Sequence, residues 1–452
     1  MSPLDPSQLI FPSAHGSITS TLTSLKRSNL SISNRLHSIK HDADFVQSVA
    51  EAYHLPLIAN ERCGGWYIPP SQKAGSAYFK STDGHYGQWS FSLRRLNLQV
   101  LDVIERHGGC IIVDSTRRGK SMPDALSKTV PIWTAVLNCL LFPDHPSTHS
   151  LRSPGDVVSP SEHAQIEQRL SRFVMELRDL DFDTDSLRQK LRGHPMRVGW
   201  VTPDTDISAL AANPANSNLV VLCTASSRTS NRGADDPDYV QGAADDSESW
   251  AHGLDAAMFW SHSEQLLSTA EDDLPDVIEW LLLVDQKAEK CIRQPVLVRP
   301  TTNIWIANNA AAEMRYPEFD VVISCSEMQS HALAEKMKHC YLHLACTTGK
   351  VGSRRLRQEL PKLEHFVEKV TPTTRVLITC QTGKDLSVGV ALAIICLFCT
   401  DDGTPRPSEC SKDATTRTKT MIKHRLSWIM ISMPDTAPSR ATLQSVNALL
   451  LG

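Results

Sequence analysis

Residues 376–398, VLITCQTGKDLSVGVALAIICLF, constrain the fold more than any other part of the sequence. A β-branched run ends at Cys380, a short loop with Gly383 follows, and the apolar stretch from Val388 to Phe398 is long enough for a buried helix. Strand, loop and helix in this order are typical of a phosphate-binding site, because loop N–H groups and the positive helix end converge on an anion. The alternative is a buried strand-end cysteine followed by an ordinary helix start.

Length, charge and cysteine usage limit the classes of protein. With 452 residues and 41% apolar composition, the chain is long enough for two or three hydrophobic cores. Its twelve cysteines lie scattered in apolar contexts, and the polar N-terminus resembles no signal peptide, so we expect reduced thiols in the cytosol or nucleus. No apolar run reaches the length of a membrane span. The net charge of −4 excludes a globally basic nucleic-acid coat, although local clusters can still bind phosphates.

Short β-branched runs alternate with segments of helical spacing. Residues 110–115 (CIIVDS), 197–201 (RVGWV) and 219–226 (LVVLCTAS) predict strands of a mixed sheet. Residues 31–53 and 164–191 carry apolar residues at helical spacing. The alternation predicts an α/β or α+β fold.

A second cluster of polar residues follows the predicted strand at 110–115. Residues 114–120, DSTRRGK, hold a carboxylate, two hydroxyls, two arginines, a glycine and a lysine. Guanidinium groups suit phosphate oxygens and the lysine adds a point charge, so we interpret the cluster as a site for a phosphorylated ligand. A charged, solvated loop is the alternative for any one of these residues.

A third cluster is acidic and lies within residues 239–250, YVQGAADDSESW. Asp245, Asp246 and Glu248 are hard oxygen ligands of the kind that hold Mg²⁺ together with substrate phosphates, although many acidic loops are merely soluble. Cys396 and Cys399 sit in an apolar stretch and are expected in the core, not on zinc. The aromatic pair Trp66 and Tyr67 either stacks on a base or belongs to the core.

From about residue 300 the order of elements resembles the dual-specificity protein phosphatase fold. The matching segments are NIWIAN, DVVISC, YLHL, LPKLEHFVEKV and VLITCxxGxxxS. The catalytic pattern of that family, His-Cys-x-x-Gly-x-x-Arg-Ser, is broken here, because Thr379 replaces the histidine and Leu386 the arginine. Thr347, Thr348 and Gly349 stand where the family's acid is expected. We therefore expect a loop that binds phosphate without phosphatase chemistry.

Longer segments are similar to the eukaryotic initiator-tRNA 2′-O-ribosyl-phosphate transferases. These segments are NERCGGWY, YFKSTDGHYGQWSFSLRRLN, IIVDSTRRGKSMPDALSKTVPIW, YVQGAADDSESW, CQTGKDLSVG and RLSWIMISMPDTAPSRATLQSVN. The resemblance implies transfer of a ribosyl phosphate from 5-phosphoribosyl 1-diphosphate, with Mg²⁺, to the 2′-hydroxyl of adenosine 64 of initiator tRNA. It also implies a cytoplasmic enzyme without a membrane anchor, whose product is kept for initiation and excluded from elongation. The alternative function is a non-catalytic phosphatase-like module that binds a phosphorylated RNA or protein.

The clusters and the resemblance together give the organisation and the candidate residues. We expect an N-terminal α/β transferase and tRNA-binding domain over 1–295 and a phosphatase-like α/β domain over 296–452, with both loops sharing one donor site. The candidate catalytic residues are Asp114, Lys120, Lys384 and Asp385. The candidate donor-phosphate ligands are Arg117, Arg118, Lys120, Cys380, Gln381, Thr382, Gly383, Lys384 and Ser387. The candidate tRNA ligands are Arg94, Arg95, Arg354, Arg355 and Arg357, and the candidate metal ligands are Asp245 and Asp246.

Overall fold

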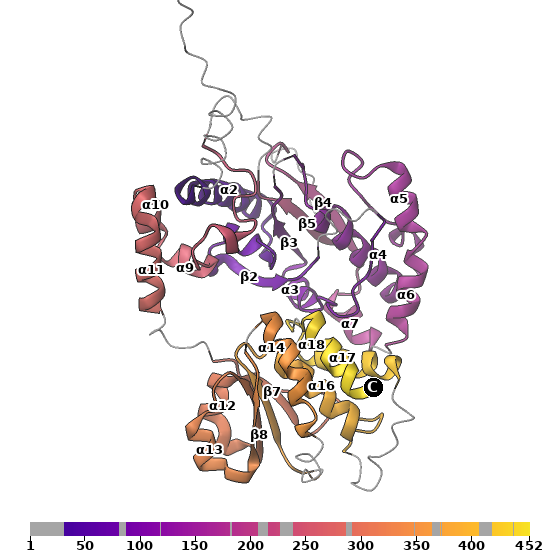
Figure 1. The fold of residues 1–452 in the computed structure, drawn as a ribbon. Helices are drawn as coiled ribbons and strands as arrows, with labels where there is room; N and C mark the ends of the chain where they lie inside the picture. The colour runs from indigo at the N-terminus through magenta and orange to yellow at the C-terminus, as the bar shows by residue number, and fades with distance from the viewer. Residues whose placement is uncertain are drawn as a thin grey trace, which may run out of the picture.

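The fold is described from a computed structural model of the chain. The described residues are 31–80, 87–117, 119–180, 183–206, 216–226, 238–285, 292–347, 349–363, 371, 373–405, 418–436 and 438–452. Figure 1 shows two sheet-containing units, the first of which carries the N-terminal residues and the second the C-terminal residues.

The first unit is built on a five-stranded parallel sheet with the order β2-β1-β3-β5-β4. Its strands are β1 (Leu57–Asn60), β2 (Lys73–Ala77), β3 (Gly109–Asp114), β4 (Met196–Val201) and β5 (Asn218–Thr224). All residues of β3 and β5 are buried. An unbroken apolar run is what a parallel strand needs when both faces of the sheet are covered.

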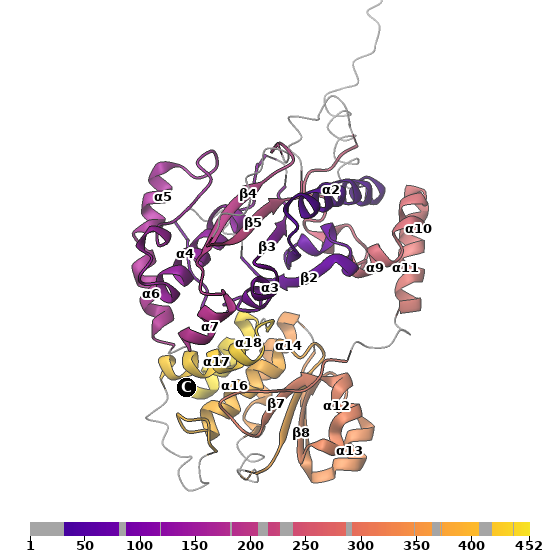
Figure 2. The same ribbon diagram turned by 180° about the vertical axis from the view of Figure 1, so that it is seen from behind.

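Alternate residues of β3 enter different cores on the two faces of this sheet. Cys110 and Ile112 pack in one cluster, whereas Ile111 and Val113 pack in the other. The first cluster includes residues of α3 (Gln99–His107), α4 (Val130–Leu141), α6 (Leu170–Arg178) and α7 (Thr184–Lys190). The second includes residues of α2 (Ile32–Tyr53), α9 (Ala256–Ser261), α10 (Ser263–Ser268) and α11 (Leu274–Asp285). Figure 2 shows α5 (Pro160–Glu167) and α6 at one edge of the unit and α10 and α11 at the other.

The second unit contains a five-stranded sheet with the order β6-β7-β10-β8-β9, in which only β6 runs antiparallel to its neighbour. The strands are β6 (Val296–Leu297), β7 (Ile304–Asn308), β8 (Val321–Ser326), β9 (Tyr341–Ala345) and β10 (Val376–Cys380). The helices are α12 (Asn309–Arg315), α13 (His331–Met337), α14 (Gly349–Glu359), α16 (Leu386–Phe398), α17 (Lys419–Ser432) and α18 (Arg440–Leu451). The prediction of an α/β fold with strand, loop and helix over 376–398 is confirmed.

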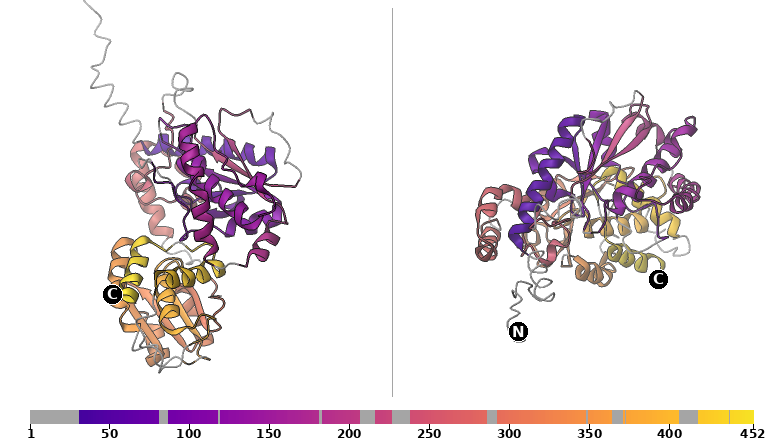
Figure 3. Two further views of the ribbon diagram at one scale, coloured as in Figure 1. Left: turned by 90° about the vertical axis from the view of Figure 1, so that its right-hand side faces the viewer. Right: turned by 90° about the horizontal axis from the view of Figure 1, so that it is seen from above.

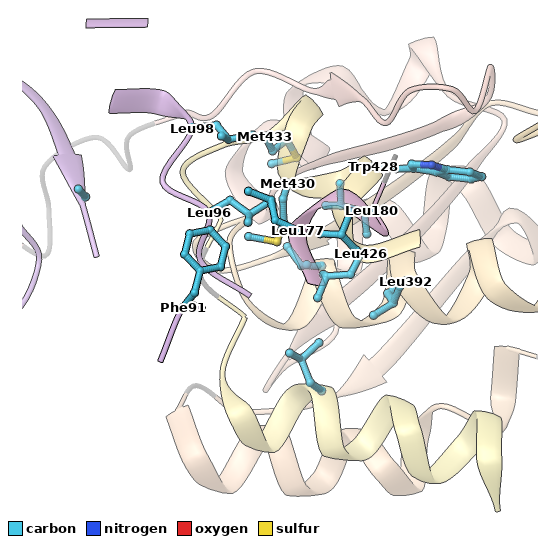
Figure 4. Close-up of a cluster of buried hydrophobic side chains, with 14 of the residues drawn as sticks. Phe91, Leu96, Leu98, Leu177, Leu180, Leu392, Leu426, Trp428, Met430 and Met433 are labelled. Atoms are coloured by element: carbon cyan, nitrogen blue, oxygen red, sulfur yellow. The ribbon is translucent and has the colours of Figure 1, made fainter. Parts of the chain in front are cut away.

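One hydrophobic core crosses between the two units. Leu96 and Leu98, which precede α3, lie in the same cluster as Met430 and Met433 from the end of α17. Figure 4 shows these side chains together with Leu177, at the end of α6. Figure 3 shows the second unit against one end of the first. The two sheets lie on either side of residue 295, and the domain boundary at that residue stays a prediction. Among the helices of the described ranges, none is both long and apolar enough to cross a membrane.

Candidate functional site

The first candidate site is built at the carboxyl end of β3, around Asp114. This carboxylate is fully buried, and Asn60 at the end of the neighbouring strand β1 donates to its Oδ2 over 2.8 Å. Its Oδ1 accepts from the Cys63 Sγ at 2.9 Å and from the Ser115 N–H at 2.8 Å. Burial raises the pKa of Asp114, and burial also raises the pKa of the Cys63 thiol well above its usual range, so the thiol donates as a neutral group.

Arg62 joins this buried carboxylate to the acidic loop. Its Nε lies 3.8 Å from Asp114 Oδ1, and its NH2 lies 3.1 Å from Asp245 Oδ1. Burial raises the pKa of Asp245, and the Arg62 charge acts in the opposite direction. A guanidinium therefore stands between two carboxylates that are separated by more than a hundred residues in the sequence.

The loop after β3 and the acidic loop are in direct backbone contact. Gly242 has φ +68°, and a Cβ at this position would lie 2.7 Å from the Thr116 carbonyl oxygen and 2.8 Å from Arg117 Cα. The side chain of Gln241 also donates to the Lys120 carbonyl over 2.8 Å. Only glycine fits at position 242, because the positive φ and the close approach of the Thr116 and Arg117 backbone both exclude a side chain.

The acidic loop lines a hollow of about 360 Å³. Arg62, Asp245, Asp246 and Glu248 contribute to its wall. Asp245 is half-buried, whereas Asp246 and Glu248 are exposed. Within the described ranges no group of three or more His, Cys, Asp or Glu side chains is placed to hold a metal ion. The protein itself thus offers two adjacent carboxylates and a guanidinium at this hollow.

The basic residues of 115–120 are placed differently from one another. Arg117 is exposed, and Arg118 lies outside the described residues. Lys120 is half-buried, with its Nζ 3.7 Å from Asp124. A ligand from solvent can therefore contact Arg117 and Lys120, whereas Asp114 is fully buried and inaccessible to it.

The second candidate site is the loop after β10. Cys380 is buried, with its Sγ 3.1 Å from the Ser387 hydroxyl. Gly383 has φ +70°, and a Cβ there would lie 2.9 Å from the backbone of Ala307, so this turn also requires glycine. Gln381 and Thr382 are exposed at its rim. The layout is that of an anion-binding loop, but Leu386 is buried where a phosphatase carries its arginine.

Two cations beside this loop are directed at a carboxylate from the chain itself. Both guanidinium NH groups of Arg293 donate to the two oxygens of Asp435, one of them over 2.8 Å. The Lys384 Nζ lies 3.4 Å from Asp435 Oδ2. Burial alone would raise the pKa of Asp435, but Arg293 and Lys384 lower it below its ordinary value.

Asp385 anchors the start of α18. Its Oδ1 accepts from the Ser439 N–H at 2.8 Å and from the Thr442 hydroxyl at 2.6 Å. Asp114 likewise holds loop and side-chain donors of the protein. The predicted catalytic roles of both carboxylates stay predictions, and the contacts favour positioning roles for both.

The five candidate tRNA ligands fall on two separate elements. Arg354, Arg355 and Arg357 are exposed on α14, and Arg94 is exposed on the segment before α3. The Arg95 guanidinium lies 3.4 Å from the centre of the Tyr78 ring. None of the five forms an ion pair within the part of the chain described, so all remain available to phosphates.

The segment of residues 60–67 has a different role from the one its aromatic pair suggested. Trp66 and Tyr67 are core residues and not a base-stacking surface, since both are buried and Trp66 packs on Trp250 with ring centres 5.4 Å apart. Their segment matters through its other members, Arg62 and Cys63. The sequence signals for these two were their place just after a short apolar strand and the family resemblance of the segment NERCGGWY, neither of which gave them a role.

Comparison with known proteins finds relatives that match nearly the full length of the chain. Residues 25–283 match the family model of the Rit1 N-terminal domain, and residues 340–450 match that of the Rit1 DUSP-like domain. The tRNA A64-2′-O-ribosylphosphate transferase of Saccharomyces cerevisiae is 32% identical over 94% of this chain and 93% of its own length. An uncharacterized protein of Schizosaccharomyces pombe is 36% identical over 92% of this chain and 94% of its own.

Solved phosphatase structures resemble part of the chain. The PTP-2 phosphatase of Cydia pomonella is 12% identical, covers 34% of this chain and 89% of its own, and gives a TM-score of 0.27. The Yvh1 phosphatase domain of Chaetomium thermophilum is 14% identical over 34% of this chain and 94% of its own, with a TM-score of 0.26. The chain matches both Rit1 family models, and the yeast transferase matches it over nearly the full length of both proteins. The chain therefore belongs to the Rit1 family of tRNA ribosylphosphate transferases.

Proposed function

We propose that this protein transfers a ribosyl phosphate from 5-phosphoribosyl 1-diphosphate to the 2′-hydroxyl of adenosine 64 of initiator tRNA. The observation that carries the proposal is the similarity to the yeast transferase over nearly the full length of both chains. The modified tRNA would then be reserved for initiation and excluded from elongation.

The geometry supports a ligand with several anionic groups. One loop carries Arg117 and Lys120 at the end of β3, and another presents the backbone of residues 381–384 at the end of β10. Ligands of parallel α/β sheets bind beyond the carboxyl ends of strands, which is where both loops lie. A donor with a 5′-phosphate and a diphosphate needs two such anion sites, and we propose that the two loops supply them.

The reaction requires one bond to form and one to break at the donor's anomeric carbon. The 2′-oxygen attacks this carbon, and the bond to the diphosphate breaks with the electron pair leaving on diphosphate. The proton of the 2′-hydroxyl passes to a base at the site. Arg117 and Lys120 would stabilise the leaving diphosphate, because charge-assisted hydrogen bonds strengthen as negative charge develops on its oxygens.

Magnesium is part of the proposal and rests on the acidic hollow. Asp245 and Asp246 are adjacent carboxylates, and Mg²⁺ is commonly held by one or two carboxylates together with substrate phosphates and water. When bound, the ion would neutralise diphosphate charge. Arg62 already compensates Asp245, so Asp246 is the carboxylate with more charge to offer a metal.

We also propose a cytoplasmic location. The ten cysteines within the described ranges are all free thiols, as expected in a reducing compartment. The cytoplasm is also where initiator tRNA is used.

The test is product formation from purified components. Protein, labelled donor and initiator tRNA should give labelled tRNA, whereas the same tRNA with 2′-deoxyadenosine at position 64 should give none. Omission of Mg²⁺ should abolish transfer if the metal assignment is right. Tight tRNA binding without any transfer would instead support the non-catalytic binding module.

A further inference from the structure

A groove of about 830 Å³ runs along the first unit where the second unit abuts it. Its described wall comes mainly from residues 78–80, residues 87–95 and α6, and Lys423 of α17 reaches it from the second unit. The groove therefore includes side chains from both halves of the chain. It is distinct from the acidic hollow, with which it shares no described lining residue.

The described wall of this groove is strongly basic. Its charged members are Lys80, Arg94, Arg95, Arg169, Arg172, Lys423 and one carboxylate, Glu176. Glu176 lies 3.7 Å from Arg172 and compensates that residue alone. A wall with six cations and one carboxylate attracts an anionic ligand.

Two of these arginines stack on aromatic rings. Arg95 lies 3.4 Å from the centre of the Tyr78 ring, and Arg169 lies 4.7 Å from that of Trp89. Arg169 also donates to the Gly87 carbonyl over 2.7 Å, which fixes its position. Stacking holds guanidinium groups in place and leaves N–H donors at their edges for phosphate oxygens.

Arg440 of the second unit lies within electrostatic range of Arg94, a residue of the groove wall. The pKa of Arg94 is lowered, first by burial and then by the positive charges of Arg95 and Arg440. Arg440 opens α18 in the second unit. Within the described ranges, no carboxylate forms an ion pair with any of these three side chains.

Arg440 occupies a position that is unfavourable for stability, in the first turn of α18. A cation in the first turn of a helix opposes the helix dipole, so fold stability alone does not account for it. The residue before it, Ser439, caps α18 and donates its N–H to Asp385 of the loop after β10. Asp385 thus fixes the helix start that carries Arg440.

We propose that this groove binds the phosphodiester backbone of the RNA substrate, with Arg94, Arg95 and Arg440 as a phosphate site shared between the two units. The inference rests on the proposed function and assigns the surface that grips the acceptor. RNA fits better than a small phosphorylated metabolite, because the cations are distributed along the wall over several elements and do not converge on one point. Spaced cations suit successive phosphates, and such contacts position a nucleic acid without reading its bases.

The experiment is tRNA binding by fluorescence anisotropy at several salt concentrations. The full-length double variant Arg94→Gln/Arg440→Gln is compared with Arg178→Gln/Arg299→Gln, which removes the same charge from exposed positions outside the groove wall. The groove variant should bind tRNA at least about tenfold more weakly and with a salt slope lower by roughly 0.7 to 0.9 for each lost phosphate contact. The control should match the wild type, and thermal melts should show both variants folded.

The outcomes separate this inference from the proposed function. Unchanged tRNA affinity and salt slope in the groove variant would overturn the groove assignment, even if the wild type is an active transferase. Weaker tRNA binding together with an equal loss of donor affinity would also overturn it, because the groove would then be a donor site. Absence of transfer by the wild type, with the predicted binding defect intact, would remove the proposed reaction and leave the RNA groove standing.

Discussion

The loops after β3 and after β10 share a layout but differ in electrostatics. At the first, Arg62 lies between Asp114, which is fully buried, and Asp245, and burial raises the pKa of both carboxylates. At the second, Arg293 and Lys384 converge on Asp435, whose side chain is 39% exposed, and lower its pKa. The same strand–loop geometry thus surrounds carboxylates with opposite responses to pH.

The two loops differ in how many cations compensate each carboxylate. At the first loop, the single guanidinium of Arg62 compensates two carboxylates, so the stability of this loop depends on Arg62. In the second, two cations serve one carboxylate that water can also reach. An anionic ligand could therefore bind Lys384 in place of Asp435, because Asp435 would keep Arg293 and solvent. Binding of Arg62 to a ligand would leave the buried Asp114 carboxylate without its cation.

The largest expected effect is on stability when the central arginine of each loop is removed. Arg62→Ala should lower the free energy of unfolding by about 3 kcal/mol, because it leaves the buried Asp114 and the half-buried Asp245 without their cation. Arg293→Ala should cost about 1 kcal/mol or less, because Asp435 keeps Lys384 and solvent. Urea unfolding of both variants measures the difference, with Arg106→Ala as an exposed control. Equal losses for the two variants would contradict the contrast between the loops.

The next effect is on donor affinity. Lys120→Ala and Lys384→Ala should each weaken 5-phosphoribosyl 1-diphosphate binding by about 1.5 to 3 kcal/mol, roughly tenfold to over a hundredfold, if each loop holds one end of the donor. Arg117→Ala should behave like Lys120→Ala.

Calorimetric titration of the donor into each variant, with Lys190→Ala as control, measures these losses. A loss confined to one loop would show that the donor does not bridge the two. The loop without a loss would then be free to contact tRNA phosphate.

The pH dependence of stability should have opposite signs at the two loops. The raised pKa of Asp114 means that its contribution is fully present below its ordinary pKa and is lost as pH rises through the raised value. The lowered pKa of Asp435 means that its contribution is present above its ordinary pKa and is lost as pH falls through the lowered value.

Melting temperatures between acid and neutral pH, for Asp114→Asn and Asp435→Asn against the wild type, test this. As pH rises, the wild type should lose stability relative to Asp114→Asn and gain it relative to Asp435→Asn. Difference curves that slope in the same direction would be inconsistent with the assigned environments.

The smallest expected effect is at Cys380. Its Sγ is buried against Ser387, and Leu386 leaves the loop without its arginine, so Cys380→Ser should retain most transferase turnover. Hydrolysis of p-nitrophenyl phosphate should be negligible in both proteins. A folded serine variant that binds tRNA but has no transferase activity would show that the thiol takes part in the reaction.

Local patterns predicted the elements well and the site only in part. β3, β4, β5 and β10 lie within a residue or two of the predicted runs, because buried parallel strands carry continuous β-branched sequence. The helical spacing over 164–191 is divided in the structure among three helices. The pairing of Arg62 with Asp245 spans 183 residues, and no local pattern encodes such a contact. For the same reason, the sequence did not show that the charge of Arg440 acts on Arg94.

The contact of Gly242 with the loop after β3 has a mechanical consequence. Because no side chain separates the two backbones, Thr116 and Arg117 cannot shift toward Gly242 without pushing the acidic loop as well. A movement of the basic loop onto a ligand would therefore carry Asp245 with it, and the two loops would respond as one rigid body. Alanine at position 242 would push the two loops apart, because its Cβ would overlap the backbone of Thr116 and Arg117.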